Sequence, residues 1–339
     1  RDVERSRGLG DVYKRQQGHA VYASDTSFVT LTNSGTEVAR LQLTHSNPVM
    51  KNNENRFLTY GIGSSSYEIS SFDETLYSGN AENKIYTGDV ASNGTYCLVT
   101  EDNGYLTTLY AYSKNNNRIY KYSFSEYYIT SVAINKDGSG CVATGVSSDK
   151  GSAVTGVYVL DFSQEKPVST YKISGDSVLD CKYLTSDTAV LVGSQASYIV
   201  KKGEKNYKTV SYEDKTLSNY CFNTDTSTYT MALSRSGDGR SVALISYNSN
   251  GEAQYTINTE HKADSLSVYK GTVAILDGNV VHGYNQNGDL LYSTNSGTGS
   301  KKIVLASDYT AYILSVNQIR FIDLDSVSSD DTAQTSKQE

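Results

Sequence analysis

The sequence predicts an all-β protein built from repeated four-stranded units, a β-propeller. Tyr accounts for 29 of 339 residues and Pro for only 2, and no long helical pattern interrupts the strand-forming residues. One short apolar strand type recurs about every 41 residues, a spacing typical of propeller blades. Charged residues make up 20% of the chain, and this composition excludes collagen, a coiled coil and a polytopic membrane protein.

The recurring strand is apolar on both faces, which predicts a strand covered by neighbours on both sides. It occurs eight times, at Ala20–Ser24, Phe57–Gly61, Cys97–Thr100, Cys141–Gly145, Ala189–Gly193, Tyr229–Leu233, Val273–Leu276 and Thr310–Leu314.

The residues after each recurring strand predict the rest of a blade. A third strand follows, as in Leu106–Tyr112, and then a tight polar turn such as Asn287-Gly288. Such turns favour hairpins because their residues accept positive φ. A fourth strand, as in Arg118–Phe124, is more polar, as expected of a blade edge that borders solvent.

Eight units predict an eight-bladed propeller over residues 17–325, with seven blades as the alternative. The first unit lacks an opening strand and is therefore expected to be truncated, while the last stops after its third strand at Leu324. A strand from a missing N-terminus is expected to close the ring. Residues 326–339 carry no apolar pattern and are expected to be a disordered tail. No linker divides the body, so we expect one domain.

Residues 1–16 resemble translated sequencing-adapter read-through and are expected to be a disordered artefact, with a genuine basic amphipathic N-terminus as the alternative. The segment holds five Lys/Arg and three Asp/Glu, so the net charge of −7 becomes −9 without it. An acidic chain argues against nucleic-acid binding through bulk charge.

The cysteines and histidines do not have the spacing of a metal site. The four cysteines follow the blade period and include no CxxC pair, so we expect small buried side chains. The four histidines have no partner at ligand spacing. No nucleophile elbow or phosphate-binding loop is present. The sequence therefore predicts no catalytic residue, no metal and no cofactor.

Four residues near junctions between units are the candidates for ligand binding. Tyr127 and Tyr128 could form an exposed aromatic patch, and Asp176 lies at the equivalent junction of the next unit. His261 lies near a later junction and could line a ligand site. Ordinary packing is the competing interpretation for each.

The chain from about His19 to Leu324 resembles the bacterial domain-of-unknown-function 5711 family, found mainly in Firmicutes. The residues that carry the resemblance are Ser46–Val49, Phe57–Gly61, Asp89–Gly94, Ile129–Gly138 and Ile319–Leu324. The resemblance implies a propeller held outside the cell by an N-terminal membrane helix. It implies no activity and transfers no catalytic residue.

These observations favour a non-enzymatic binding or scaffold propeller, extracytoplasmic and membrane-anchored. Its expected partner is a protein or a cell-envelope polymer, its only membrane contact is the missing helix, and it is expected to be a monomer. One alternative is a propeller hydrolase or lyase that acts on envelope polysaccharide or peptide. Another is an intracellular WD40-like platform for protein interactions. Fold alone does not choose between them.

Overall fold

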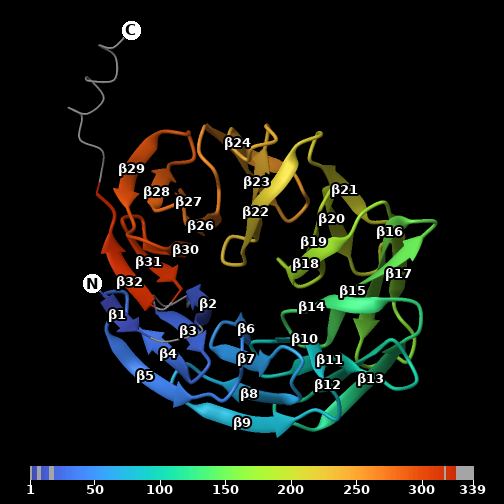
Figure 1. Cartoon of the computed structure of the whole chain (residues 1–339). Helices are drawn as coiled ribbons and strands as arrows, with labels where there is room; N and C mark the ends of the chain where they lie inside the picture. Colours follow the sequence, from blue (N-terminus) through green and yellow to red (C-terminus); the bar gives the residue numbers. More distant parts are fainter. Residues whose placement is uncertain (1, 6–8, 15–18, 317, 326–339) are drawn as a thin grey trace, which may run out of the picture.

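A computed structural model of the chain shows eight four-stranded antiparallel sheets arranged in a ring, an eight-bladed β-propeller (Figure 1). The structure describes residues 2–5, 9–14, 19–316 and 318–325. Within this part of the chain there is no helix, and consequently none that could cross a membrane. The predicted fold and blade number are confirmed.

Each blade is an up-and-down meander whose first strand is innermost. The first strands of most neighbouring blades contact one another around the ring. They are β2 (Leu9–Lys14), β6 (Pro48–Asn53), β10 (Ile85–Val90), β14 (Tyr128–Ile134), β18 (Val178–Tyr183), β22 (Thr216–Asn223), β26 (Ser265–Tyr269) and β30 (Ser300–Ser307).

The second strands are those that the repeat predicted. They are β3 (Ala20–Ser24), β7 (Arg56–Gly61), β11 (Tyr96–Glu101), β15 (Gly140–Asp149), β19 (Thr188–Gly193), β23 (Thr228–Ser234), β27 (Thr272–Asp277) and β31 (Thr310–Ser315). The third strands are β4 (Ser27–Leu31), β8 (Ser66–Ser70), β12 (Thr107–Tyr112), β16 (Ser152–Asp161), β20 (Ala196–Lys201), β24 (Val242–Asn248), β28 (Val280–Tyr284) and β32 (Gln318–Asp323).

The outermost strands border solvent. They are β5 (Glu37–Gln42), β9 (Thr75–Asn80), β13 (Arg118–Phe124), β17 (Ser169–Ser174), β21 (Lys208–Ser211), β25 (Ala253–Thr259), β29 (Leu290–Asn295) and β1 (Asp2–Arg5). The predicted gradient in polarity is visible in burial: all residues of β19 are buried, whereas all but one of β9 are exposed.

The first and last blades are completed by the start of the chain. From Ala20 onward each has three strands, β3–β5 and β30–β32. The backbone of β2 pairs with β3, and β1 pairs with β32, where Arg5 lies opposite Gln318. Two stretches of the segment expected to be disordered are thus strands. That this segment is an adapter artefact stays a prediction, and the expected tail, residues 326–339, lies outside the described residues.

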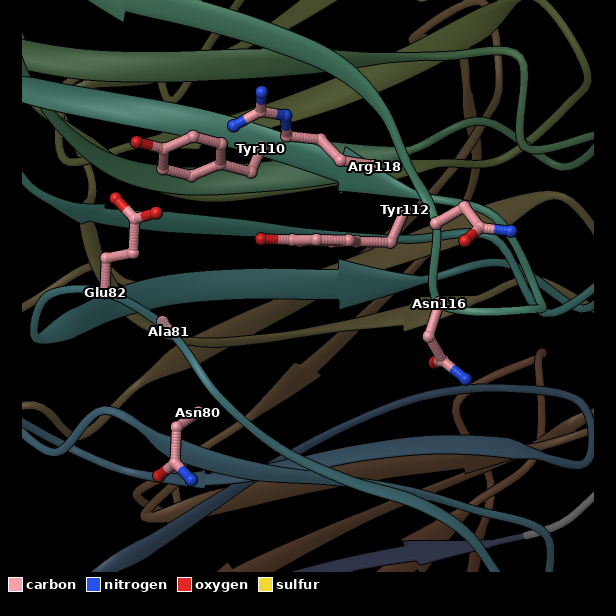
Figure 2. Close-up of a pocket in the computed structure, with 8 residues that line it drawn as sticks. Asn80, Ala81, Glu82, Tyr110, Tyr112, Asn116 and Arg118 are labelled. Atoms are coloured by element: carbon pink, nitrogen blue, oxygen red, sulfur yellow. The ribbon is translucent and has the colours of Figure 1, made fainter.

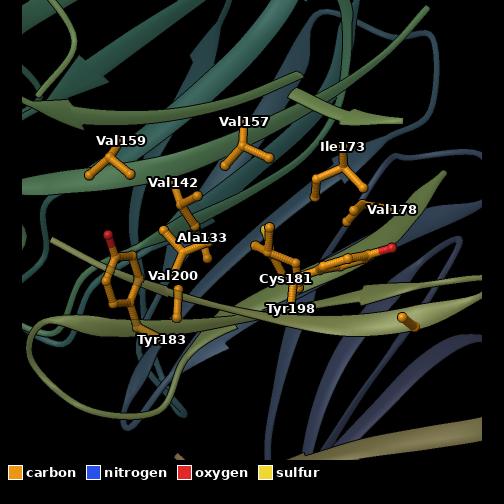
Figure 3. Close-up of a cluster of buried hydrophobic side chains, with 13 residues drawn as sticks. Ala133, Val142, Val157, Val159, Ile173, Val178, Cys181, Tyr183, Tyr198 and Val200 are labelled. Carbon is orange, nitrogen blue, oxygen red and sulfur yellow. The ribbon is translucent and has the colours of Figure 1, made fainter. Parts of the chain in front are cut away.

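The core consists of apolar layers between adjacent blades. Figure 3 shows the layer between the fourth and fifth blades, where Val142 and Val157 face Cys181, Tyr183 and Val200. Val142 and Val157 are fully buried. Because each blade buries one face against the next, neighbouring blades stabilise one another.

Several innermost strands contain a β-bulge near their first residues. The register shifts between Ile85 and Thr87 in β10, and between Val178 and Asp180 in β18. Corresponding shifts occur in β2, β14, β22 and β30. A bulge leaves one residue without a cross-strand partner and turns the strand.

Candidate functional site

Asp176, in the connection from β17 to β18, is an anchor for its own blade. Its carboxylate accepts hydrogen bonds from the backbone N–H groups of Ser194, Gln195 and Ala196, at 2.9–3.2 Å. It also accepts one from the Tyr198 hydroxyl at 2.7 Å. Asp176 is 2% exposed, and its oxygens are occupied by the β19–β20 turn. We therefore interpret Asp176 as a residue that stabilises this turn.

Polar side chains in other connections between blades also contact the blade that follows. His45, between β5 and β6, is buried and contacts both Glu68 and Ser66 of β8. Asp264, just before β26, accepts a hydrogen bond from the Gly278 N–H at 2.9 Å. Several connections between blades thus contain a polar residue whose side chain binds the blade that follows.

Tyr127 packs inside its blade. A Cβ atom at Gly156 would lie 2.5 Å from the Tyr127 ring, so the ring occupies the space left by that glycine. The ring also contacts Tyr158 in an edge-to-face arrangement, with centroids 6.1 Å apart. These contacts favour ordinary packing, and not an exposed recognition patch, as the role of Tyr127.

Tyr128, the first residue of β14, is 53% exposed. Two other large apolar side chains lie at the same end of the neighbouring innermost strands. Tyr86, at the bulge of β10, is 43% exposed, and Leu179, at the bulge of β18, is 53% exposed. Because β14 contacts both β10 and β18, these three exposed residues lie on three consecutive blades, and we call them the aromatic arc.

His261 belongs to a separate group of side chains, His261, Asp277 and His282, which we call the histidine cluster. It lies in the connection from β25 to β26, and its ring stacks on that of His282 in β28, with centroids 3.6 Å apart and planes 9° apart. Its Nδ1 is 3.4 Å from Oδ2 of Asp277 at the end of β27. Burial, followed by the proximity of His261, lowers the pKa of His282 to about 4.

The innermost strands line an open cavity of about 810 Å³ in the centre of the ring. Its lining includes Lys51 of β6, Asp89 of β10, and Asp180 and Lys182 of β18. The Lys182 ammonium donates a hydrogen bond to the Asn52 carbonyl at 3.3 Å and thereby connects the fifth blade with the second across the centre.

The buried charges of this cavity are mutually compensating. Burial alone would lower the pKa of Lys51. The negative charge of Asp180, followed by Tyr60 and Asp89, has the opposite and larger effect, so the pKa of Lys51 is raised. Burial raises the pKa of Asp89, against the opposing effects of Lys182 and of the Ile134 N–H. Paired charges of this kind are required when ionisable groups lie inside a protein.

A smaller pocket of about 340 Å³ lies on the outer side of the ring, between the second and third blades (Figure 2). Tyr110 and Tyr112 line it together with Glu82 and Arg118. The Arg118 guanidinium lies 5.9 Å from the centre of the Tyr110 ring, a cation–π distance. The pocket combines both charges with aromatic faces.

The structure thus places the four predicted residues in three settings. Tyr127 and Asp176 stabilise blades, Tyr128 is part of the aromatic arc, and His261 is part of the histidine cluster. Sequence analysis did not identify Tyr86 or Leu179, because the bulges that expose them are not visible in a period-2 pattern. It also missed the central Lys51, Asp89, Asp180 and Lys182, although charged residues in otherwise apolar innermost strands could have indicated them.

Comparison with solved structures supports the fold. The crystal structure of a eukaryotic initiation factor is similar, with a TM-score of 0.59 and 11% identity, covering 94% of this chain and 86% of that one. The C-terminal WD40 domain of Sif2 has a TM-score of 0.57 and 13% identity, with coverage of 95% and 83%. Kluyveromyces lactis Hsv2 has a TM-score of 0.57 and 9% identity, with coverage of 86% and 100%.

At these identities the similarity demonstrates the fold alone, and WD40 propellers are among the structural neighbours. No match was found among curated proteins. A family model, described as a family of unknown function (DUF5711), matches residues 1–324. The chain therefore belongs to the DUF5711 family.

Proposed function

We propose that this protein is a non-enzymatic binding propeller that recognises a protein partner through the aromatic arc of Tyr86, Tyr128 and Leu179. The observation that carries the proposal is the exposure of three large apolar side chains at one end of three adjacent innermost strands. Tyr is enriched among the residues that dominate binding energy at protein interfaces.

The rigidity of the ring supports this proposal. Each residue of the arc is next to a buried residue in the sequence. These buried neighbours, Ile85, Ile129 and Val178, are at most 3% exposed. The arc is therefore presented by strands whose backbone is held by the core. A preorganised surface loses little conformational entropy when a partner binds.

The test compares partner retention by matched single variants. The variants are Tyr86→Ser, Tyr128→Ser and Leu179→Ser, and the control is Ile119→Ser, a change at a 46% exposed residue of outer strand β13. The immobilised chain is incubated with envelope extract of the native host, and retained proteins are quantified by mass spectrometry. We expect a partner retained equally by the wild type and the control, and reduced roughly tenfold by each arc variant. Equal retention by all four variants would contradict the proposal.

A propeller enzyme is the second candidate, and one observation favours it. Asp89 and Asp180 line the same cavity and both interact with Lys51, and the pKa of Asp89 is raised by burial. Carboxylates in different environments can divide acid and base roles. Release of reducing ends from envelope polysaccharide fragments by the wild type, and its loss in Asp180→Asn, would support a hydrolase. Absence of product from the wild type would count against it.

The proposal includes a location on the outer side of the bacterial membrane, with a membrane anchor. The support is the resemblance described from the sequence. Protease treatment of intact host cells, followed by detection with an antibody against the propeller, tests the location. Digestion in intact cells supports it, whereas protection until lysis would favour the intracellular interaction platform.

A further inference from the structure

The strongest feature outside the aromatic arc is the histidine cluster of the seventh blade. One ligand atom from each of His261, Asp277 and His282 lies within 4.8 Å of those of the other two. The three come from separate segments: the β25–β26 connection, the end of β27 and the middle of β28. Among the described residues, this is the group of three His, Cys, Asp or Glu side chains with such proximity.

We infer that His261, Asp277 and His282 bind one divalent transition-metal ion of the Zn²⁺ class through two imidazoles and a carboxylate. Nitrogen ligands favour Zn²⁺, Co²⁺, Ni²⁺ and Cu²⁺ over Ca²⁺ and Mg²⁺, which prefer oxygen. Three protein ligands leave a coordination position for water or for a donor atom of a bound partner.

One distance in the cluster already fits such an ion, and a histidine ring must reorient to complete the site. Two ligands of a tetrahedral Zn²⁺ with bonds of about 2.1 Å lie about 3.4 Å apart. His261 Nδ1 and Asp277 Oδ2 are already 3.4 Å apart. The His261 ring must turn out of its stack on His282, because a metal lies in the plane of each imidazole that binds it and the two ring planes are only 9° apart. The His261 side chain is 43% exposed and has room to turn.

The other two side chains are already oriented. His282 is 6% exposed, and its Nδ1 forms a 2.7 Å hydrogen bond with the Ser293 hydroxyl, which leaves Nε2 for a metal. Asp277 Oδ2 accepts a hydrogen bond from the Lys262 N–H at 3.3 Å. Hydrogen bonds that orient ligand side chains are typical of protein metal sites.

The experiment is isothermal titration calorimetry of the full chain with ZnCl₂ after dialysis against chelator. We expect one Zn²⁺ per chain for the wild type and at least tenfold weaker binding for His261→Ala and Asp277→Asn. His19→Gln is the matched control, since it removes a histidine of the first blade, and it should bind like the wild type. Addition of CaCl₂ should produce no binding heat.

A second readout is independent of stability. Co²⁺ added to the wild type should produce visible absorption bands of a four- or five-coordinate ion, which His261→Ala should abolish. Because His261 is partly exposed, that variant should fold and can be checked by circular dichroism. The inference is overturned if the wild type does not bind Zn²⁺ at 1:1 stoichiometry, or if folded His261→Ala binds it as tightly as the wild type.

Discussion

The carboxylate of Asp89 in β10 accepts a hydrogen bond from the backbone N–H of Ile134 in β14, at 2.8 Å. Asp89 is 5% exposed and faces the central cavity. A single buried side chain thus connects the third blade to the fourth while it compensates the charge of Lys51.

Asp89→Ala should reduce the free energy of unfolding by about 3 kcal/mol, because the Ile134 N–H loses its acceptor and Lys51 loses one of its compensating charges. Asp89→Asn should be less harmful, since its amide oxygen can still accept the hydrogen bond. Urea denaturation followed by circular dichroism measures both, with the exposed Glu165→Ala as control. A loss below 0.5 kcal/mol, within the range of about ±0.5 for surface changes, would show that the contact contributes little.

Gly156→Ala should destabilise the fourth blade by about 1–3 kcal/mol, because its new methyl group overlaps the Tyr127 ring. The matched control is Gly237→Ala, where a Cβ would have no heavy atom within 4 Å. This control should be neutral or slightly stabilising. In the double variant Tyr127→Ala with Gly156→Ala, the cost of the glycine change should largely vanish, and additive costs would refute the assigned contact.

Asp176→Ala should destabilise the protein by about 3 kcal/mol or more, since several donors of the β19–β20 turn lose a charged acceptor. Thermal unfolding at pH 7 provides the measurement. The contrasting variant is Tyr128→Ser in the aromatic arc, which should leave stability nearly unchanged. A stable Asp176→Ala protein would return Asp176 to the set of ligand-binding candidates.

Stability should decrease in acid partly through Asp161. Hydrogen bonds from Ser163, and then from Lys202, lower the pKa of Asp161 from its usual 3.8 to about 2. A lowered carboxyl pKa adds stability above the unfolded-state pKa, and that contribution is lost as the pH falls from about 4 through about 2. Asp161→Asn should therefore be less stable than the wild type at pH 7, with the difference shrinking toward pH 2. A pH-independent difference in urea midpoint would contradict this assignment.

The cysteines should be unreactive in the native protein. Cys97, Cys141 and Cys181 are buried free thiols, and burial raises the pKa of Cys181 to about 12. The thiolate is the reactive form, so little is available at pH 8. Ellman's reagent should react slowly with the folded protein and rapidly with four thiols in denaturant, as the composition of 4 Cys requires. Fast modification of these thiols in the native state would indicate local opening of the third to fifth blades.

The repeat was predictable because its signals lie in short stretches of the sequence. A strand such as Ala189–Gly193, apolar on both faces, can be covered only by neighbours on both sides, and a turn such as Asn287-Gly288 indicates a hairpin. These signals identified all eight second strands. An N-terminal strand was expected to close the ring, but the segment that pairs with β32, Asp2–Arg5, was not predictable, because ring closure joins the two ends of the chain and leaves no local pattern.

The candidate sites were predictable only in part. Tyr128 could be placed at an exposed junction from the strand order, whereas Tyr86 depends on a bulge that local alternation does not reveal. Asp176 has the residue type and place of a ligand, yet its neighbours use its oxygens for a turn. Whether such a residue binds a ligand or stabilises the fold depends on its neighbours in space and not on its residue type.

The sequence by itself determined the all-β class, the blade period and the order of strands, since hydrophobic alternation and turn residues act over a few positions. Only the tertiary structure decided which distant side chains meet. His261, Asp277 and His282 converge because adjacent strands and a blade connection fold back on one another. Lys182 reaches Asn52 across the centre because eight blades complete the ring. Such contacts depend on the packing of whole blades, which no short stretch of sequence encodes.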